Sequence, residues 1–200
     1  MALLGLVILA GIWSGIHPHD YFTWLLEVMP VFIALPILLV TRNRFSLTPL
    51  TYTLIAIHAI VLMIGGHYTY AEVPLFNWLR DTFELSRNHY DRLGHLVQGF
   101  VPAIIAREIL LRTTALQRGK MLFFLVVCVC LAISASYELV EWMVAVQSGS
   151  DAVAFLATQG DPWDTQKDML MALIGSIAAQ VLLSRRHDLQ LQRYVLVPHK

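Results

Sequence analysis

The chain has 200 residues, of which 57% are hydrophobic and only 14% are charged. Soluble domains average about 25% charged residues, so this composition excludes an ordinary soluble domain and indicates an integral membrane protein. The formal net charge is zero at pH 7, without the basic excess of nucleic-acid-binding proteins, so we expect no nucleic-acid partner.

Six apolar runs have the length, or nearly the length, of a membrane-spanning helix, which needs about 20 residues. They cover residues 2–16, 21–41, 47–65, 94–112, 121–145 and 166–184. The first run lacks the basic region of a signal peptide, which favours a retained helix over a cleaved leader. We therefore predict an all-α fold, a polytopic membrane helix bundle with about six transmembrane helices, and a single integral membrane domain over residues 1–200.

The distribution of Lys and Arg predicts the orientation, because these residues are enriched in cytoplasmic loops. They follow the second and sixth runs and lie between the fourth and fifth, at Arg42, Arg44, Arg112, Arg118, Lys120, Arg185, Arg186 and Arg193. The 147–165 segment has no Lys or Arg and carries Asp151, Asp161 and Asp164. We therefore predict that both termini are cytoplasmic and that this segment faces outward.

The 66–93 segment between the third and fourth runs mixes charges of both signs with aromatic residues. Helix counting places it on the outer side of the membrane. Its aromatic residues are typical of a stretch that lies along the membrane surface, and we predict this position for Tyr68, Tyr70, Phe76, Trp78 and Phe83.

The first of three clusters of ionisable residues lies at the entrance to the fourth run. Such groups near membrane depth are costly, so they indicate a functional site by default. Asp91 and His95 are four residues apart on one helical face, where they could bind one ion or hydrogen-bond each other. Alternatively, Asp91 caps the helix and His95 makes one interhelical hydrogen bond. Gln98 and Gly99 continue this face inward, and Gly99 would allow another helix to approach closely.

The fifth run carries the second cluster, Glu138 and Glu141. They are three residues apart, so the two carboxylates repel each other unless a cation or a proton lies between them. The alternative is that Glu141 reaches the membrane interface beside Trp142, and that only Glu138 is buried and paired with an arginine.

The third cluster, Asp161, Asp164 and Asp168, leads into the sixth run. Asp161 precedes Pro162, which predicts a helix N-cap, and Asp164 then occupies the third helical position, as in a capping box. Asp168 lies one turn deeper and has no such structural explanation. We expect Asp164 and Asp168 to belong to a site, with Asp161 and Gln166 as additional candidates.

The third run and its exit supply two further candidates, His58 in the middle of the run and His67 just beyond its outer end. A lone histidine such as His58 is more often a hydrogen-bonded residue between helices than a ligand. Arg107 and Glu108, near the cytoplasmic end of the fourth run, can reach the lipid headgroups, and we interpret them as structural.

The residue types in the three clusters suit a divalent metal such as Zn, Mn or Fe, because imidazole and carboxylate oxygens ligate these ions. The candidate metal ligands are His95, Glu138, Asp168 and Asp91. Glu141 and Asp164 are the candidate catalytic residues, each able to serve as a general base. This combination favours an outward-facing site that acts on a cell-envelope or lipid-linked substrate.

Two other classes of function remain open. The clusters could form a buried hydrogen-bond network in a structural or accessory membrane protein. They could also serve a proton- or ion-coupled transporter, since intramembrane carboxylates and histidines relay protons. Transport is disfavoured because the clusters crowd one face of the membrane and the chain shows no inverted repeat.

Three motifs carry a resemblance to a known family. They read YDRLGH at residues 90–95, SYELVEW at 136–142 and QGDPWDTQKD at 159–168. This combination resembles the YjdF family of bacterial inner-membrane proteins over nearly the whole chain. The resemblance implies residence in a bacterial inner membrane among its lipids, and it implies no particular activity.

A more distant resemblance is to the VanZ-like superfamily, whose pattern has an Asp-Lys-x-x-His motif, a Glu on the next helix, and an Asp with a downstream Gly on the last. In this chain the corresponding residues are Asp91, His95, Glu138, Asp168 and Gly175, and Arg92 replaces the usual lysine. VanZ-like proteins are linked to glycopeptide resistance, so this resemblance implies a role at the cell envelope.

Overall fold

The computed structural model describes residues 2–148 and 153–194, and these residues form helices and turns without any strand. The predicted outward-facing residue Asp151 lies outside the described residues. In chain order the elements are α1 (Ala2–Ser14), α2 (Tyr21–Thr41), α3 (Pro49–Tyr68), the 3-10 turn η1 (Tyr70–Glu72), α4 (Pro74–Thr82), α5 (Tyr90–Thr113), α6 (Lys120–Ser148), α7 (Val153–Leu156) and α8 (Asp164–Tyr194).

Five of these helices, α2, α3, α5, α6 and α8, are long and apolar enough to cross a membrane. They correspond to five of the six predicted runs, and the predicted all-α membrane fold is confirmed. Helix α1 has 13 residues. At 1.5 Å per residue it reaches about 20 Å, short of the roughly 30 Å hydrocarbon core.

Two helices, α5 and α8, extend furthest beyond the apolar runs that predicted them. Helix α5 begins at Tyr90, so Asp91 lies in its first turn. Helix α8 continues to Tyr194, ten residues past the predicted end at residue 184. This extension buries His187 and Leu191 and exposes Arg185 and Arg186, so polar residues can continue the helix by facing away from the bundle.

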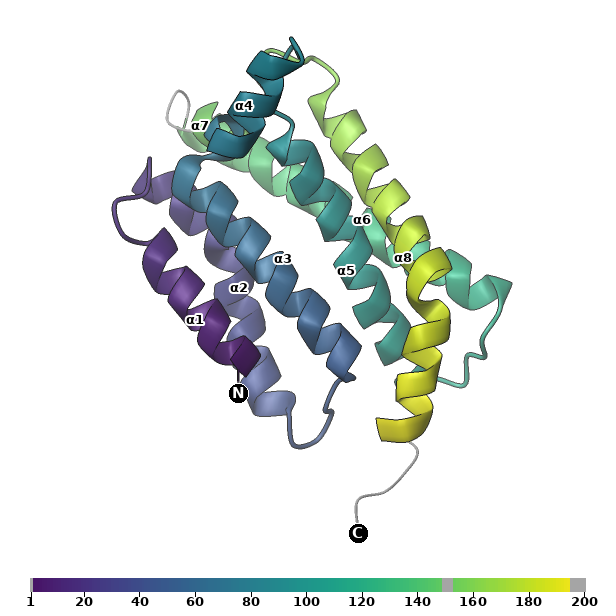
Figure 1. Ribbon diagram of the computed structural model, residues 1–200. Helices are drawn as coiled ribbons and strands as arrows, with labels where there is room; N and C mark the ends of the chain where they lie inside the picture. The colour runs from purple at the N-terminus through teal and green to yellow at the C-terminus, as the bar shows by residue number, and fades with distance from the viewer. Residues whose placement is uncertain (1, 149–152, 195–200) are drawn as a thin grey trace.

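The bundle has two halves joined along α3 and α5 (Figure 1). Helices α1, α2 and α3 form one half, and α5, α6 and α8 form the other, in which α5 and α8 pack together most extensively. Helix α1 begins and α8 ends at the same end of the bundle, whereas α4 lies across the opposite end (Figure 1). We call this opposite end the α4 end.

Glycines set the close approach of α5 to α8. A Cβ atom added at Gly99 would overlap the backbone of Ala172, and one added at Gly175 would come within 2.9 Å of the Phe100 nitrogen. Small residues of this kind let helix backbones touch in membranes. The predicted role of Gly99 is confirmed, and the contact aligns the first turns of α5 and α8.

The 66–93 segment is exposed along α4, as the predicted surface position requires, but Tyr70 is buried. Helix α4 has no buried residue, and Leu75 and Trp78 are exposed, as a surface position requires. The prediction for Tyr70 is wrong, because its side chain is only 5% exposed. Its ring fills a slot made by Gly65 and Gly94, since a Cβ atom added at either glycine would collide with the ring.

The prediction that Arg107 and Glu108 reach the lipid headgroups is also wrong, because both are buried. The extension of α8 brings His187 between them. Arg107 Nη1 donates to His187 Nδ1 at 2.9 Å, and His187 Nε2 donates to Glu108 Oε2 at 3.1 Å. Arg107 also donates to Asp188 at 2.7 Å.

Glu108 also joins α5 to the start of α3. Its carboxylate accepts hydrogen bonds from the Thr48 nitrogen at 2.9 Å and from the Thr51 hydroxyl at 2.6 Å, and Arg112 donates to it at 2.9 Å. We call this group the α3–α8 network, consisting of Thr48, Thr51, Arg107, Glu108, Arg112, His187 and Asp188.

A methyl group at the α5–α8 contact tests this packing. We expect Gly99→Ala to lower the free energy of unfolding by about 1–3 kcal/mol, because backbone atoms of α8 must move to admit the Cβ atom. Gly5→Ala on α1 is the matched control, since a Cβ atom there would have no neighbour within 4 Å among the residues that the structure describes. Denaturation of both variants in detergent micelles measures the difference, and equal stabilities would contradict the packing.

The orientation in the membrane remains a prediction and can be tested by labelling single cysteines. In a variant without Cys128 and Cys130, we expect a membrane-impermeant maleimide to label Trp163→Cys in intact spheroplasts. Labelling of Arg186→Cys should require permeabilised membranes, because basic segments face the cytoplasm. The opposite labelling pattern would show that both termini face outward.

Candidate functional site

Residues from the three sequence clusters meet at the α4 end around the imidazole of His95. His95 Nε2 lies 3.5 Å from Asp91 Oδ1 on α5, 3.8 Å from Glu138 Oε1 on α6 and 3.9 Å from Asp168 Oδ1 on α8. All four side chains are buried. Carboxylates from three helices therefore surround one histidine nitrogen.

The other nitrogen of His95 has a partner on its own helix. His95 Nδ1 lies 3.0 Å from the Gln98 side-chain oxygen. An amide oxygen only accepts hydrogen bonds, so Nδ1 carries the hydrogen. Nε2 therefore faces the three carboxylates either as a lone pair, available to a cation, or as a second N–H donor. The same pattern orients histidines that bind metals.

Arg87 is a member of the site that the sequence reasoning missed. Its guanidinium donates to Asp91 Oδ2 at 3.1 Å and to Asp164, and also to the carbonyl oxygen of Ala157 at 3.0 Å. The sequence signal was its position one turn before Asp91. In the sequence Arg87 is only one of the mixed charges of the 66–93 segment.

Arg92 was missed in the same way, apart from its place in the VanZ-like pattern. It donates to Asp164 Oδ1 at 2.5 Å, to Asp161 Oδ2 at 3.2 Å and to Asp168. Both arginines thus donate to the Asp164 carboxylate. These hydrogen bonds make Asp164 less available as the general base that the sequence predicted.

The ion pairs at this end contain more acid than base. We call them the α4-end network, consisting of Arg87, Asp91, Arg92, His95, Glu138, Asp161, Asp164, Lys167 and Asp168. Its five carboxylates face two arginines and one lysine, so two negative charges remain when His95 is neutral. Glu138 Oε1 is buried and has no hydrogen-bond partner among the residues that the structure describes. Because an uncompensated buried charge is costly, this end requires a bound cation or protons.

The start of α8 differs from the predicted N-cap. The helix begins at Asp164, whereas the prediction placed its first residue at Pro162. Asp161 Oδ1 accepts a hydrogen bond from the Trp163 nitrogen at 3.0 Å, which makes a turn before the helix. Lys167 and this N–H group hold the pKa of Asp161 below its ordinary value, because both stabilise the charged carboxylate.

Three additional candidates do not join the α4-end network. His67 Nδ1 lies 3.0 Å from the Ser14 carbonyl oxygen, and its ring stacks at 4.5 Å on Trp13, so it packs against α1. His58 Nε2 is buried on α3 without a hydrogen-bond partner in the described ranges. Gln166 is exposed. Glu141 lies one turn after Glu138 on α6 and is half-buried.

The sequence reasoning also missed Glu27 on α2. Its side chain is buried, and its Oε2 accepts a hydrogen bond from the Tyr137 hydroxyl at 3.4 Å. The signal was available, because an acidic residue inside an apolar run is a site candidate by itself.

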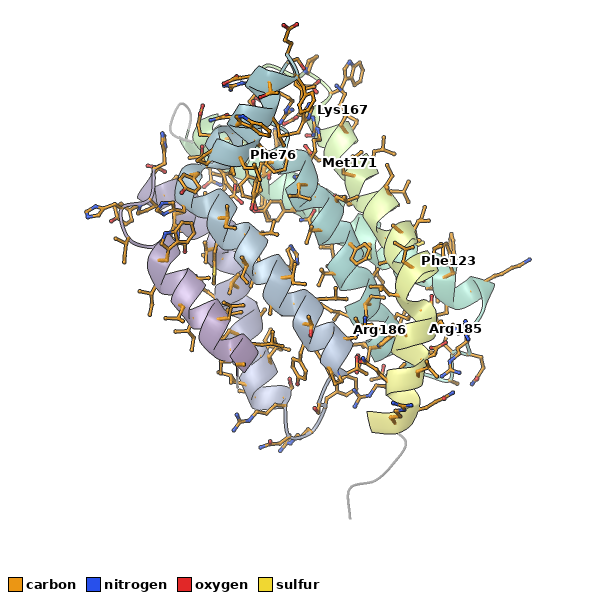
Figure 2. The ribbon with its side chains drawn as sticks, viewed as in Figure 1. Phe76, Phe123, Lys167, Met171, Arg185 and Arg186 are labelled. Atoms are coloured by element: carbon orange, nitrogen blue, oxygen red, sulfur yellow. The ribbon has the colours of Figure 1, made fainter. Side chains whose placement is uncertain are left out.

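A loop before α8 covers this end of the bundle. The Asn88 nitrogen donates to the Gln159 side-chain oxygen at 2.9 Å, and Gln159 Nε2 donates back to the Asn88 carbonyl oxygen at 2.9 Å. Ala157 and Gln159 have φ angles of 47° and 48°, in the left-handed region that costs non-glycine residues about 1–3 kcal/mol. Figure 2 shows Lys167 of α8 and Phe76 of α4 at the same end.

The paired hydrogen bonds predict how firmly this loop is held. We expect Gln159→Ala to raise the rate of amide hydrogen exchange at residues 157–160 about thirtyfold, because two bonds of about 1 kcal/mol each are lost. Gln166→Ala is the control, since this exposed side chain has no partner among the described residues. Unchanged exchange in Gln159→Ala would mean that other contacts hold the loop.

Comparison with known proteins agrees with the membrane location that the apolar helices indicate. Residues 1–189 match the family model described as "Predicted membrane protein (DUF2238)". The chain is 54% identical over 186 residues to the protein named "Inner membrane protein YjdF" of Escherichia coli (strain K12), an alignment that covers 93% of this chain and 89% of that protein. No solved structure matches the chain. The chain therefore belongs to the YjdF family (DUF2238) and is a multi-pass protein of the inner membrane.

Proposed function

We propose that this protein binds a divalent cation at the α4 end and uses the site on a lipid-linked or other cell-envelope substrate. The proposed ligands are Asp91, His95, Glu138 and Asp168. The observation that carries the proposal is the placement of three carboxylates, from three helices, within 4 Å of His95 Nε2.

The spacing of the side chains supports a cation. Ligand atoms of Asp91, His95 and Asp168 lie within 4.8 Å of one another. Around a tetrahedral zinc ion with bonds of about 2.1 Å, ligand atoms lie about 3.4 Å apart, so small side-chain rotations would complete the coordination. The negative excess of the α4-end network also supports a cation, as does Glu138 Oε1, which has no hydrogen-bond partner within residues 2–148 and 153–194.

The chemistry of the ligands suits Zn, Mn or Fe, because all are oxygen or imidazole donors. A bound cation would supply Lewis acidity and a more acidic bound water. Glu141 is the better candidate for the general base, because it lies one turn from Glu138 and is half-buried. Asp164, held by Arg87 and Arg92, instead orients the two guanidinium groups beside the ligands.

The envelope substrate is supported by the position of the site and by the VanZ-like pattern. Asp91 and Asp164 lie in the first turns of two membrane-length helices, and we expect this level to coincide with the start of the lipid headgroups. The predicted orientation places this level at the outer surface. The distant VanZ-like resemblance assigns Asp91, His95, Glu138 and Asp168 to one site and implies a cell-envelope role.

A second candidate function is a structural or accessory role, in which the α4-end network only ties helices together. The observation that favours it is that all four aspartates of the network already contact an arginine. In this case the excess negative charge would be neutralised by protons, one of them on His95.

Elemental analysis of the detergent-purified protein separates the two candidates. We expect about one metal ion per chain in the parent, and at least about tenfold less in His95→Ala and in Glu138→Ala, because each change removes a ligand. His67→Ala is the matched control, since His67 packs against α1. If no sample retained metal after incubation with Zn, Mn and Fe salts, the cation site would be refuted and the structural role would stand.

A further inference from the structure

Helix α2 has 21 residues, and Glu27 is its single charged residue. The Glu27 side chain points into the bundle, where the residue is only 2% exposed. A carboxylate at membrane depth is expensive, and such residues face the bundle interior where they serve a site. Neither the YjdF nor the VanZ-like motifs include this position.

The packing of α2 on α3 fixes the position of the Glu27 Cβ atom. A Cβ atom added at Gly66 would lie 3.3 Å from the Glu27 Cβ atom and 3.1 Å from a Val28 methyl carbon. Gly66 therefore lets α2 lie directly against α3 at this level. The carboxylate then extends away from this contact toward α6.

On α6 the Glu27 carboxylate meets Tyr137. The Tyr137 hydroxyl donates to Glu27 Oε2 at 3.4 Å, although α2 and α6 share little direct packing among the described residues. The Tyr137 ring lies 6.3 Å from the His95 ring, with an angle of 74° between their planes. Tyr137 directly precedes Glu138 on α6, so a rotation of α6 that moves the Tyr137 ring also moves the Glu138 side chain.

We infer that Glu27 is a positioning residue of the α4-end site. Its carboxylate holds the Tyr137 hydroxyl, which fixes the Tyr137 ring against His95 and sets the rotation of α6 that points Glu138 toward His95 Nε2. The inference rests on the proposed function to the extent that Glu138 is a ligand. It adds a fourth helix, α2, to a site otherwise built from α5, α6 and α8.

A buried glutamate of the α3–α8 network provides the matched comparison. Glu108 is also fully buried and hydrogen-bonded, but it lies at the opposite end of the bundle. If buried glutamates act only by holding helices together, Glu27 and Glu108 variants will differ only in stability. A positioning role adds an effect on the site for Glu27 alone.

Mn²⁺ affinity of the full-length protein in detergent, measured from the electron paramagnetic resonance signal of free Mn²⁺, tests this role. We expect Glu27→Leu and Tyr137→Phe each to weaken Mn²⁺ binding about tenfold, the size of effect seen when groups that orient metal ligands are removed. The double variant should be no weaker than either single one, because both remove the same hydrogen bond.

Two further variants sharpen the test. Glu27→Gln should stay within about threefold of the parent, since an amide oxygen still accepts from the Tyr137 hydroxyl. Glu108→Gln should lower stability without changing Mn²⁺ affinity. The positioning role is refuted if Glu27→Gln loses as much affinity as Glu27→Leu, or if Glu27→Leu binds Mn²⁺ like the parent.

A readout without metal separates this inference from the cation proposal. The distance between α2 and α6 can be measured by pulsed electron paramagnetic resonance. Spin labels are attached at Tyr21→Cys on α2 and Val146→Cys on α6 in a variant without Cys128 and Cys130. We expect a narrow distribution in the parent and with Glu27→Gln, and a broader one with Glu27→Leu. Broadening in a protein that binds none of Zn, Mn and Fe would refute the cation site and keep Glu27 as the group that positions Tyr137. An unchanged distribution would refute the positioning role.

Discussion

The close packing of α5 against α8 is the constraint on which the rest of the structure depends. Gly99 and Gly175 remove the side chains that would separate the two backbones. Because the helices stay together along their length, charged residues at both ends can meet across the contact. Arg92 reaches Asp168 at the α4 end, and Arg107 reaches His187 at the other end. The charged networks at the two ends therefore both depend on these two glycines.

The α3–α8 network and the α4-end network differ in how fully their charges are compensated. This difference distinguishes a network that only stabilises the bundle from a candidate site. Glu108 receives hydrogen bonds from both hydroxyl and N–H donors of α3, from His187 and from Arg112, so its charge is compensated. At the α4 end the carboxylates outnumber the arginines and lysine, and Glu138 keeps an oxygen without a hydrogen-bond partner in the described part of the chain. A network built only for stability would not retain this excess, because unpaired buried charge opposes folding. The α4 end is thus better suited to hold a ligand.

The α4 end is also the more strained part of the described structure. Its covering loop places Ala157 and Gln159 in the left-handed region, and hydrogen bonds from Arg87 and Asn88 hold this loop in place. Backbone strain of this kind persists only where surrounding contacts impose it, and it is concentrated at functional sites. Strain, excess charge and a buried histidine coincide in one region. Together they favour a site there over a simple contact between helices.

The sequence by itself determined the fold class and the main site candidates. Apolar runs specify membrane helices because the backbone must satisfy its own hydrogen bonds in lipid, and buried ionisable residues such as His95, Glu138 and Asp168 stand out against them. Only the tertiary structure decided which partners these residues have. Arg92 pairs with aspartates about 70 positions away, and Tyr70 fills a slot between two glycines. Such contacts depend on how the helices pack, and helical periodicity within one segment carries no information about that packing.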